Sequence, residues 1–292
     1  MDLDELMSRA RDVERCRLTP EQILLTGRVV LVTGGGGGIG QSIALACAAF
    51  GADVVVLDIV AERCAATQAA IERQGGRCLG IRCDVMDTSA LRDAISTAVS
   101  EFGRIEILVN NAGGTGSGSF LTMPERSMRR HIDLNLVSAF VASQEVAKAM
   151  IAAGGGGAIV NVASIEAERA APTFAVYAAC KAGLVNFTKT LALELAEHDI
   201  RVNCIAPDHT ITPGMRGNRS GPVVPGTWTD STESWARLIP LGREGLADEC
   251  AAAVIWLASP MAAYVTGATI NVDGGTSAAK GWLRDGSNWS LS

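Results

Sequence analysis

A run of five glycines between an apolar segment and a helical pattern constrains the fold of this chain more than any other feature. The run lies within Thr33–Gly40, follows the apolar residues 29–32, and leads into the helical pattern of residues 41–50. A strand, a glycine turn and a helix in that order form a pyrophosphate site, because backbone N–H groups and the helix N-terminus can approach the phosphates. A second glycine run, 154–157, leads into a strand instead. We interpret that second run as the end of a helix and a loop without a ligand.

Strand and helix patterns alternate along the chain. Strands are expected near 29–33, 53–58, 77–83, 105–110, 158–163, 201–205 and 269–273, and helices near 39–50, 60–74, 88–102, 123–152, 174–198 and 247–258. Alternation with continuous apolar strands predicts an α/β fold: a doubly wound parallel sheet of Rossmann type, with about seven strands and helices on both faces.

Nothing in the sequence indicates a second folded domain. We expect an N-terminal extension over 1–26, a single domain over 27–276 and a C-terminal tail over 277–292. The irregular stretch 207–238 is rich in proline and glycine, and a loop of that length in a compact domain is usually functional. We therefore expect this stretch to have a functional role.

The second predicted strand ends in a carboxylate. Asp58 lies eighteen residues after Gly40, where an acidic side chain would accept hydrogen bonds from an adenosine ribose. Neither Ile59 nor Val60 could bind a 2′-phosphate. The sequence therefore predicts NAD rather than NADP.

Acid–base chemistry is suggested by three polar residues that follow the apolar run 158–163: Ser164, Tyr177 and Lys181. Tyr177 and Lys181 are four apart and lie on one face of a predicted helix, and Ser164 is thirteen residues upstream of the tyrosine. A phenol is a weak acid, and a nearby ammonium group favours its ionised form. Ser164 could donate a hydrogen bond to the oxygen on which the tyrosine acts.

Together these features resemble the short-chain dehydrogenase/reductase family over roughly residues 27–276. The resemblance implies that the stretch 207–238 covers the substrate, because it matches the family's substrate-covering segment by position. The resemblance implies a catalytic tetrad of Asn135, Ser164, Tyr177 and Lys181. The cofactor-binding positions that it implies are Gly34, Gly38, Ile39, Gly40, Asp58, Asp84, Val85, Asn111, Ala112, Gly113, Tyr177, Lys181, Pro207, Thr210 and Thr212. Family members that prefer NADP commonly have a basic residue where this chain has Gly37, which again favours NAD.

The chain departs from the family pattern in two places. After the sixth strand the family usually has P-G-x-[VI]-x-T, and here Asp208 replaces the glycine and Thr210 the aliphatic residue. These changes bear on the contacts to the nicotinamide. Cys180 replaces the usual serine before the catalytic lysine and leaves the tetrad intact.

Composition excludes several other classes. A net charge of −6 and a pI near 5.2 disfavour nucleic-acid or anionic-membrane partners. Eight scattered cysteines without a C-x-x-C motif suit reduced, buried thiols, and three histidines without ligand spacing predict no metal site. The charged N-terminus lacks an apolar signal region and every apolar run is too short to span a bilayer, so we expect a cytoplasmic protein.

The resulting prediction is an NAD-dependent oxidoreductase that transfers a hydride between nicotinamide and a secondary alcohol or ketone, with a steroid- or terpenoid-like compound as one possible substrate. A 3-oxoacyl-thioester reductase is the alternative, followed by a family member catalysing dehydration or epimerisation and by a non-catalytic nucleotide-binding regulator. The family resemblance and two wide apolar helix faces further predict a homotetramer built as a dimer of dimers. The residues on those faces are Phe140, Val141, Val146, Met150, Leu184, Phe187, Leu191 and Leu195.

Overall fold

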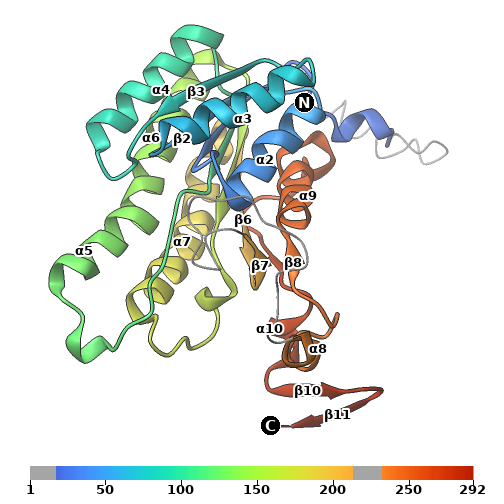
Figure 1. Ribbon diagram of the computed structural model, residues 1–292. Helices are drawn as coiled ribbons and strands as arrows, with labels where there is room; N and C mark the ends of the chain where they lie inside the picture. Colours follow the sequence, from blue (N-terminus) through green and yellow to red (C-terminus); the bar gives the residue numbers. More distant parts are fainter. Residues whose placement is uncertain (1–17, 213–231, 292) are drawn as a thin grey trace.

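The protein is organised around a seven-stranded sheet. The structure, a computed structural model, describes residues 18–212 and 232–291. The strands β1 (Val29–Thr33), β2 (Asp53–Asp58), β3 (Cys78–Arg82), β4 (Ile107–Asn110), β5 (Gly157–Val162), β6 (Ile200–Pro207) and β9 (Thr269–Val272) lie in the order β3-β2-β1-β4-β5-β6-β9. All neighbouring pairs are parallel (Figure 1). The predicted doubly wound parallel sheet is confirmed.

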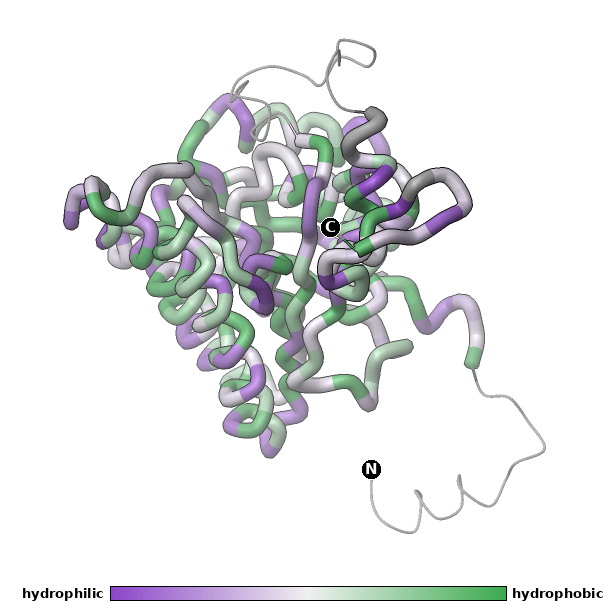
Figure 2. Tube along the Cα trace, turned by 90° about the horizontal axis from the view of Figure 1, so that it is seen from below, coloured by the Kyte–Doolittle hydropathy of each residue, from purple (hydrophilic) through white to green (hydrophobic). Residues whose placement is uncertain are grey.

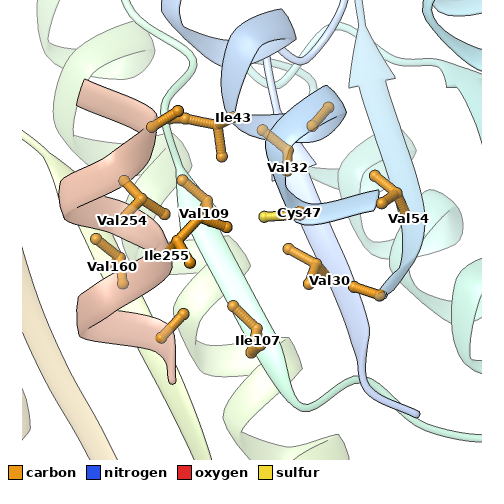
Figure 3. Close-up of a cluster of buried hydrophobic side chains, with 14 of the residues drawn as sticks. Val30, Val32, Ile43, Cys47, Val54, Ile107, Val109, Val160, Val254 and Ile255 are labelled. Carbon is orange, nitrogen blue, oxygen red and sulfur yellow. The ribbon is translucent and has the colours of Figure 1, made fainter. Parts of the chain in front are cut away.

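Helices cover both faces of this sheet. On one face, α2 (Gly38–Ala49), α3 (Ala61–Arg73) and α9 (Ala247–Ala258) pack on alternate strand residues such as Val30 and Val32 (Figure 3). On the other face, α4 (Thr88–Phe102), α6 (Ser138–Ala153) and α7 (Ala175–Glu194) pack on the intervening residues, including Val29 and Leu31. Strands buried on both faces need apolar residues throughout, whereas the outer helices alternate hydrophobic and hydrophilic positions (Figure 2).

The strand order changes direction at β1, and open α/β sheets have their ligand crevice at the carboxyl ends of the strands at such a point. The chain runs outward from β1 to β3 and then crosses through α4 to β4, on the other side of β1. The loops after β1 and β4 therefore diverge at this edge, where open α/β sheets bind their ligands.

The helix expected over 123–152 is divided, which corrects the sequence prediction. It consists of α5 (Glu125–Ile132), a π-helical turn (Asp133–Val137) and α6. Within the turn the Asn135 amide donates to the His131 carbonyl oxygen at 3.0 Å, and the Ser138 hydroxyl donates to the Leu134 carbonyl oxygen at 2.7 Å. These side chains satisfy carbonyl groups that a wider turn would leave without a regular helical partner.

Among the described residues, one helical stretch, 125–153, is long and apolar enough to cross a membrane. Its residues Ala142, Val146 and Met150 lie in the core against the sheet, and Val146 is fully buried. The stretch is therefore accounted for as a core helix.

The carboxyl-terminal part contains elements that the sequence analysis did not predict. Within the expected loop 207–238, β7 (Thr210–Ile211) pairs with β8 (Gly245–Leu246), and α8 (Thr232–Leu238) precedes the return to the sheet. Residues 213–231 lie outside the described residues. After α10 (Thr276–Ala279), β10 (Trp282–Asp285) and β11 (Asn288–Leu291) form an antiparallel hairpin at the end of the molecule (Figure 1).

Short 3-10 helices complete the described elements: Pro20–Ile23, Phe120–Thr122, Ile165–Ala167, Ala196–His198 and Pro260–Ala262. Leu25, which follows the first of them, is fully buried in the core beside α2. The described cysteines, at 47, 64, 78, 83, 180, 204 and 250, are free and buried, as predicted.

Candidate active site

The glycine loop between β1 and α2 brings backbone atoms closer together than any side chain would allow. Gly34 and Gly38 have φ angles of +63° and +55°, a region that favours glycine. A Cβ atom on Gly40 would overlap the Gly34 carbonyl and the Asn111 side chain. Glycine is therefore required at these positions for the loop to fold tightly onto the start of α2.

The segment after β4 holds this loop in place. The Asn111 amide donates to the carbonyl oxygens of Thr33 and Gly34 at 2.9 and 3.1 Å. The Thr33 hydroxyl accepts hydrogen bonds from the backbone N–H groups of Asn111 and Ala112, both at 3.0 Å. The residues that the sequence assigns to phosphate and adenosine contacts thus form one rigid unit across β1 and β4.

Asp58 lies at the end of β2, directly beside the glycine loop. Its two carboxylate oxygens accept hydrogen bonds from the Gly36 and Val60 backbone N–H groups at 3.1 and 3.0 Å. The side chain is buried, and a Cβ on Gly36 would lie 2.8 Å from the carboxylate. The Arg63 side chain from α3 packs against the same glycines. A negative charge is therefore fixed next to the loop, with a cation nearby that the sequence analysis did not consider.

The other predicted cofactor positions lie around the same crevice. Asp84 caps its own turn, since its carboxylate accepts from the Met86 N–H at 3.0 Å, and Val85 beside it is buried. The Thr212 side chain approaches Gly38 closely. Thr210, in contrast, is buried, and its hydroxyl donates to the Asp208 carbonyl oxygen at 3.1 Å.

The four predicted catalytic residues come from three elements. Ser164 follows β5, Tyr177 and Lys181 lie one turn apart on α7, and Asn135 lies in the π-helical turn. The Lys181 ammonium nitrogen is 5.7 Å from the centre of the Tyr177 ring and donates to the Val162 carbonyl oxygen at 2.7 Å. Ser164 lies close enough to Tyr177 to lower the pKa of its phenol.

The loop after β4 connects Asn135 to this group. Asn135 exchanges two hydrogen bonds of 3.0 Å with the backbone of Gly114. A Cβ on Gly113 would lie 2.9 Å from the Asn135 side-chain oxygen and 3.4 Å from the Lys181 nitrogen. Only glycine at 113 therefore lets these two side chains converge on the loop.

Burial sets the protonation behaviour of the tyrosine–lysine pair. Burial raises the pKa of Tyr177, the Ser164 hydrogen bond lowers it, and the Glu166 carboxylate raises it further. Burial lowers the pKa of Lys181 to about 8. Lys181 is not among the groups that shift the tyrosine, so the expected lowering of the Tyr177 pKa by lysine is not found within the protein alone.

A buried chain of amides behind the site was missed by the sequence analysis. The Asn110 amide donates to the Ser143 hydroxyl and to the Asn161 side-chain oxygen at 2.9 and 2.8 Å, and the Asn161 amide donates to the Thr188 hydroxyl at 2.8 Å. The chain joins β4, β5, α6 and α7 below the catalytic residues. The sequence signal that could have indicated this chain is an asparagine within each of the two apolar strands β4 and β5.

Charged side chains lie in the segments that follow β5 and β6. The Arg169 guanidinium contacts the Glu166 carboxylate at 2.8 Å and the Asp208 carboxylate at 3.5 Å. The His209 ring lies 3.9 Å from that same Asp208 oxygen and packs against Trp235 of α8, with ring centres 4.0 Å apart and the ring planes tilted by 46°. Asp208 stands at the position where the family has glycine, and it was noted from sequence only as a departure from the pattern.

A cavity of about 470 Å³ lies beside this cluster. It is lined by residues of β7, β8, the start of α9 and the turn after β9, including His209 and Asp273. None of Asn135, Ser164, Tyr177 and Lys181 lines it. The cavity is therefore separate from the four predicted catalytic residues.

Comparison with known proteins agrees with this geometry. Residues 34–277 match a family model described as enoyl-(acyl carrier protein) reductase. The chain is 38% identical over 253 residues to a 3-oxoacyl-[acyl-carrier-protein] reductase of Synechocystis sp., covering 86% of this chain and 97% of the relative. It is also 38% identical over 251 residues to a D-threitol dehydrogenase of Mycolicibacterium smegmatis, covering 86% and 93% respectively.

Among solved structures, a 7α-hydroxysteroid dehydrogenase complexed with NADH and 7-oxo glycochenodeoxycholic acid superimposes with a TM-score of 0.81 at 34% identity, covering 88% of this chain and 97% of that one. The chain belongs to the short-chain dehydrogenase/reductase family. It is thus an oxidoreductase of the class that binds a nicotinamide cofactor. The tight glycine loop and the carboxylate beside it fit a dinucleotide.

Proposed function

We propose that this protein is an NAD-dependent dehydrogenase that interconverts a secondary alcohol and a ketone. The observation that carries the proposal is the convergence of Ser164, Tyr177, Lys181 and Asn135 at the carboxyl ends of the central strands, beside the dinucleotide loop. A regulator without catalysis would have no need for a buried lysine next to a tyrosine, since burying an ammonium group costs free energy.

In the proposed mechanism Tyr177 is the acid–base group. During oxidation its phenolate takes the proton from the substrate hydroxyl, while Ser164 donates a hydrogen bond to the same substrate oxygen. The bound nicotinamide supplies the hydride acceptor and a positive charge that favours the phenolate. Lys181, fixed by the Val162 carbonyl, adds a second positive charge, and Asn135 holds the adjacent loop. General-base assistance of this kind is worth roughly 10²–10⁴-fold in rate.

Asp58 supports the choice of NAD. The buried carboxylate lies against Gly36, where it would accept hydrogen bonds from the ribose hydroxyls and repel a 2′-phosphate. Two like charges ~4 Å apart at an effective dielectric near 20 repel by about 4 kcal/mol. Arg63 offsets part of that repulsion because its side chain packs over the same loop. We therefore expect a strong preference for NAD rather than an absolute one.

The relatives support more than one substrate class. A hydroxysteroid dehydrogenase among them supports the steroid- or terpenoid-like compound expected from the sequence, and a D-threitol dehydrogenase supports a smaller polyol. The 3-oxoacyl reductases favour the alternative, a 3-oxoacyl-thioester substrate. The net charge of −6 and the Asp58 carboxylate count against that alternative, since a thioester reductase would be expected to present basic residues to an acyl carrier and to favour NADPH.

A panel assay tests the proposal. Purified protein is incubated with NAD+ or NADP+ and secondary alcohols of both classes, and in the reverse direction with ketones and a 3-oxoacyl thioester, while the absorbance of reduced cofactor is followed. We expect oxidation of a secondary alcohol with NAD+. Turnover confined to the thioester with NADPH would establish the alternative instead.

We also propose the homotetramer. Three of the residues predicted to form the interfaces, Val146, Met150 and Leu184, are buried within the chain itself. Other large apolar side chains on the same helices remain exposed, among them Phe140, which packs on Phe187 with ring centres 4.5 Å apart, and Leu193. Exposed apolar surface of this kind favours association. A monomeric mass by light scattering at micromolar concentration would contradict the proposal.

A further inference from the structure

We propose that Asp208 binds the substrate by accepting a hydrogen bond from a second hydroxyl group, close to the carbon that is oxidised, so that the substrate is a diol or polyol. This inference rests on the proposed function, because it concerns the alcohol that Tyr177 would oxidise. It gives a role to Asp208, which stands where the family usually has a glycine.

The position of Asp208 brings it to the catalytic edge of the sheet. It directly follows β6, which pairs in parallel with β5, with Val162 opposite Ile205. Ser164 leaves β5 two residues after Val162, and Asp208 leaves β6 three residues after Ile205. Since neighbouring strands are about 5 Å apart, both residues lie at the same end of adjacent strands. A substrate held by Ser164 can therefore reach the end of β6 that Asp208 follows.

The Asp208 carboxylate is buried and only partly satisfied. Its side chain is 7% exposed, and one oxygen, Oδ1, lies 3.5 Å from the Arg169 guanidinium. The other oxygen, Oδ2, is buried and has no hydrogen-bond partner within the described parts of the chain. Leaving a buried polar atom without a partner costs free energy, and a carboxylate oxygen can only accept. The missing partner is therefore a hydrogen-bond donor, such as a hydroxyl group.

The charges around Asp208 disfavour an anion as that partner. The Arg169 guanidinium is shared between Asp208 and Glu166, so two carboxylates face one cation. The hydrogen bond to Glu166 raises the pKa of the Arg169 guanidinium, and the nearby charge of Asp208 raises it further. His209 contributes a second orphaned atom, since its Nδ1 is buried without a partner among the residues described. A neutral group that donates hydrogen bonds fits this cluster, and a substrate carboxylate or phosphate does not.

Arg169 also couples the cluster to the reacting group. It holds Glu166, and the Glu166 backbone N–H donates to the Ser164 hydroxyl oxygen at 3.2 Å. A substrate hydroxyl bound to Asp208 is thus fixed relative to the serine that orients the alcohol. Such orientation raises the rate of the chemical step.

The test compares matched alcohols in the presence of NAD+: cyclohexanol with trans-1,2-cyclohexanediol, and 2-butanol with 2,3-butanediol. A hydrogen bond to a charged group is worth about 10-fold or more in kcat/KM, so the wild type should prefer each diol by at least that factor. In Asp208→Gly, which restores the family residue, the preference should fall to near unity while the monoalcohol is still oxidised. Asp208→Asn has the same shape and should show an intermediate preference, which keeps the test valid if the glycine variant does not fold.

Asp273→Asn is the matched control. Asp273 lies in the same region, but its two oxygens already accept from the Gly275 and Ser277 N–H groups at 2.9 and 2.7 Å. Its substitution should leave the diol preference unchanged. Equal oxidation of diols and monoalcohols by the wild type, or a preference unaffected in both Asp208 variants, would overturn this inference alone. Failure to oxidise any alcohol would remove the proposed function as well.

Discussion

The nucleotide end of the crevice and the catalytic end are built in different ways. At the nucleotide end, after β1, β2 and β4, backbone groups are held by complete hydrogen bonds, as Asn111 and Asp58 illustrate. At the catalytic end, after β5 and β6, side chains carry the unusual properties: a buried lysine, a tyrosine with a raised pKa, and an aspartate oxygen without a partner among the described residues. The comparison indicates that one end is a rigid binding frame and that the other retains groups whose partners arrive with the substrate.

The largest effect should come from the catalytic end. Tyr177→Phe removes the proposed acid–base group and should lower turnover by at least ~10²-fold. NADH affinity, measured by fluorescence titration, should stay within about threefold of the wild type, because the ring and Lys181 remain. A variant that turns over alcohol at the wild-type rate would show that the tyrosine is not the acid–base group.

A change at the nucleotide end should alter the choice of cofactor without removing the catalytic groups. Asp58→Ala removes the fixed charge and leaves Arg63 beside the loop, so the ratio of kcat/KM for NAD+ to that for NADP+ should fall by about 10-fold or more. Asp53→Ala, at the opposite end of the same strand β2, is the control and should preserve the ratio. An unchanged ratio in the Asp58 variant would mean that its carboxylate does not face the ribose.

The two glycine runs allow a test of rigidity. Gly40→Ala should destabilise the protein by roughly 1–3 kcal/mol in urea unfolding and weaken NADH binding, because its Cβ would overlap the Gly34 carbonyl. Gly155→Ala should change stability by less than about 0.5 kcal/mol, because a Cβ there meets nothing within 4 Å. Equal effects of the two substitutions would argue against a tightly packed nucleotide loop.

The buried lysine should produce a smaller, pH-dependent effect. Between the folded-state pKa of Lys181, about 8, and its ordinary value of 10.5, the unfolded chain holds the proton that the native protein has lost. The free energy of unfolding contributed by this group should therefore rise with pH across that window, by up to about 1 kcal/mol per pH unit. The difference between wild type and Lys181→Met should show this slope, and that between wild type and Lys189→Met, an exposed lysine on the same helix, should not. Parallel pH profiles for wild type and Lys181→Met would contradict the burial of a charged lysine.

The difference between the two ends also explains what could be predicted from the sequence. The strands and the glycine loop follow from local patterns, and the second glycine run ends α6 as expected, with Gly154 in the left-handed region. The π-helical turn at Asn135 could not be predicted, since it depends on side chains that bond to their own helix carbonyls. The cluster around Asp208 joins Arg169 to a residue 39 positions later in the chain, and no local sequence pattern predicts that two neighbouring strands bring these residues together.

The most direct test of the account is the cofactor preference of the wild-type protein on a secondary alcohol that it oxidises. The kcat/KM for NAD+ and for NADP+ are measured at a fixed, saturating alcohol concentration. The account predicts that NAD+ is favoured by at least ~10²-fold, a little under 3 kcal/mol. Equal use of the two cofactors would contradict the assignment of Asp58 to the ribose and, with it, the proposed NAD-dependent function.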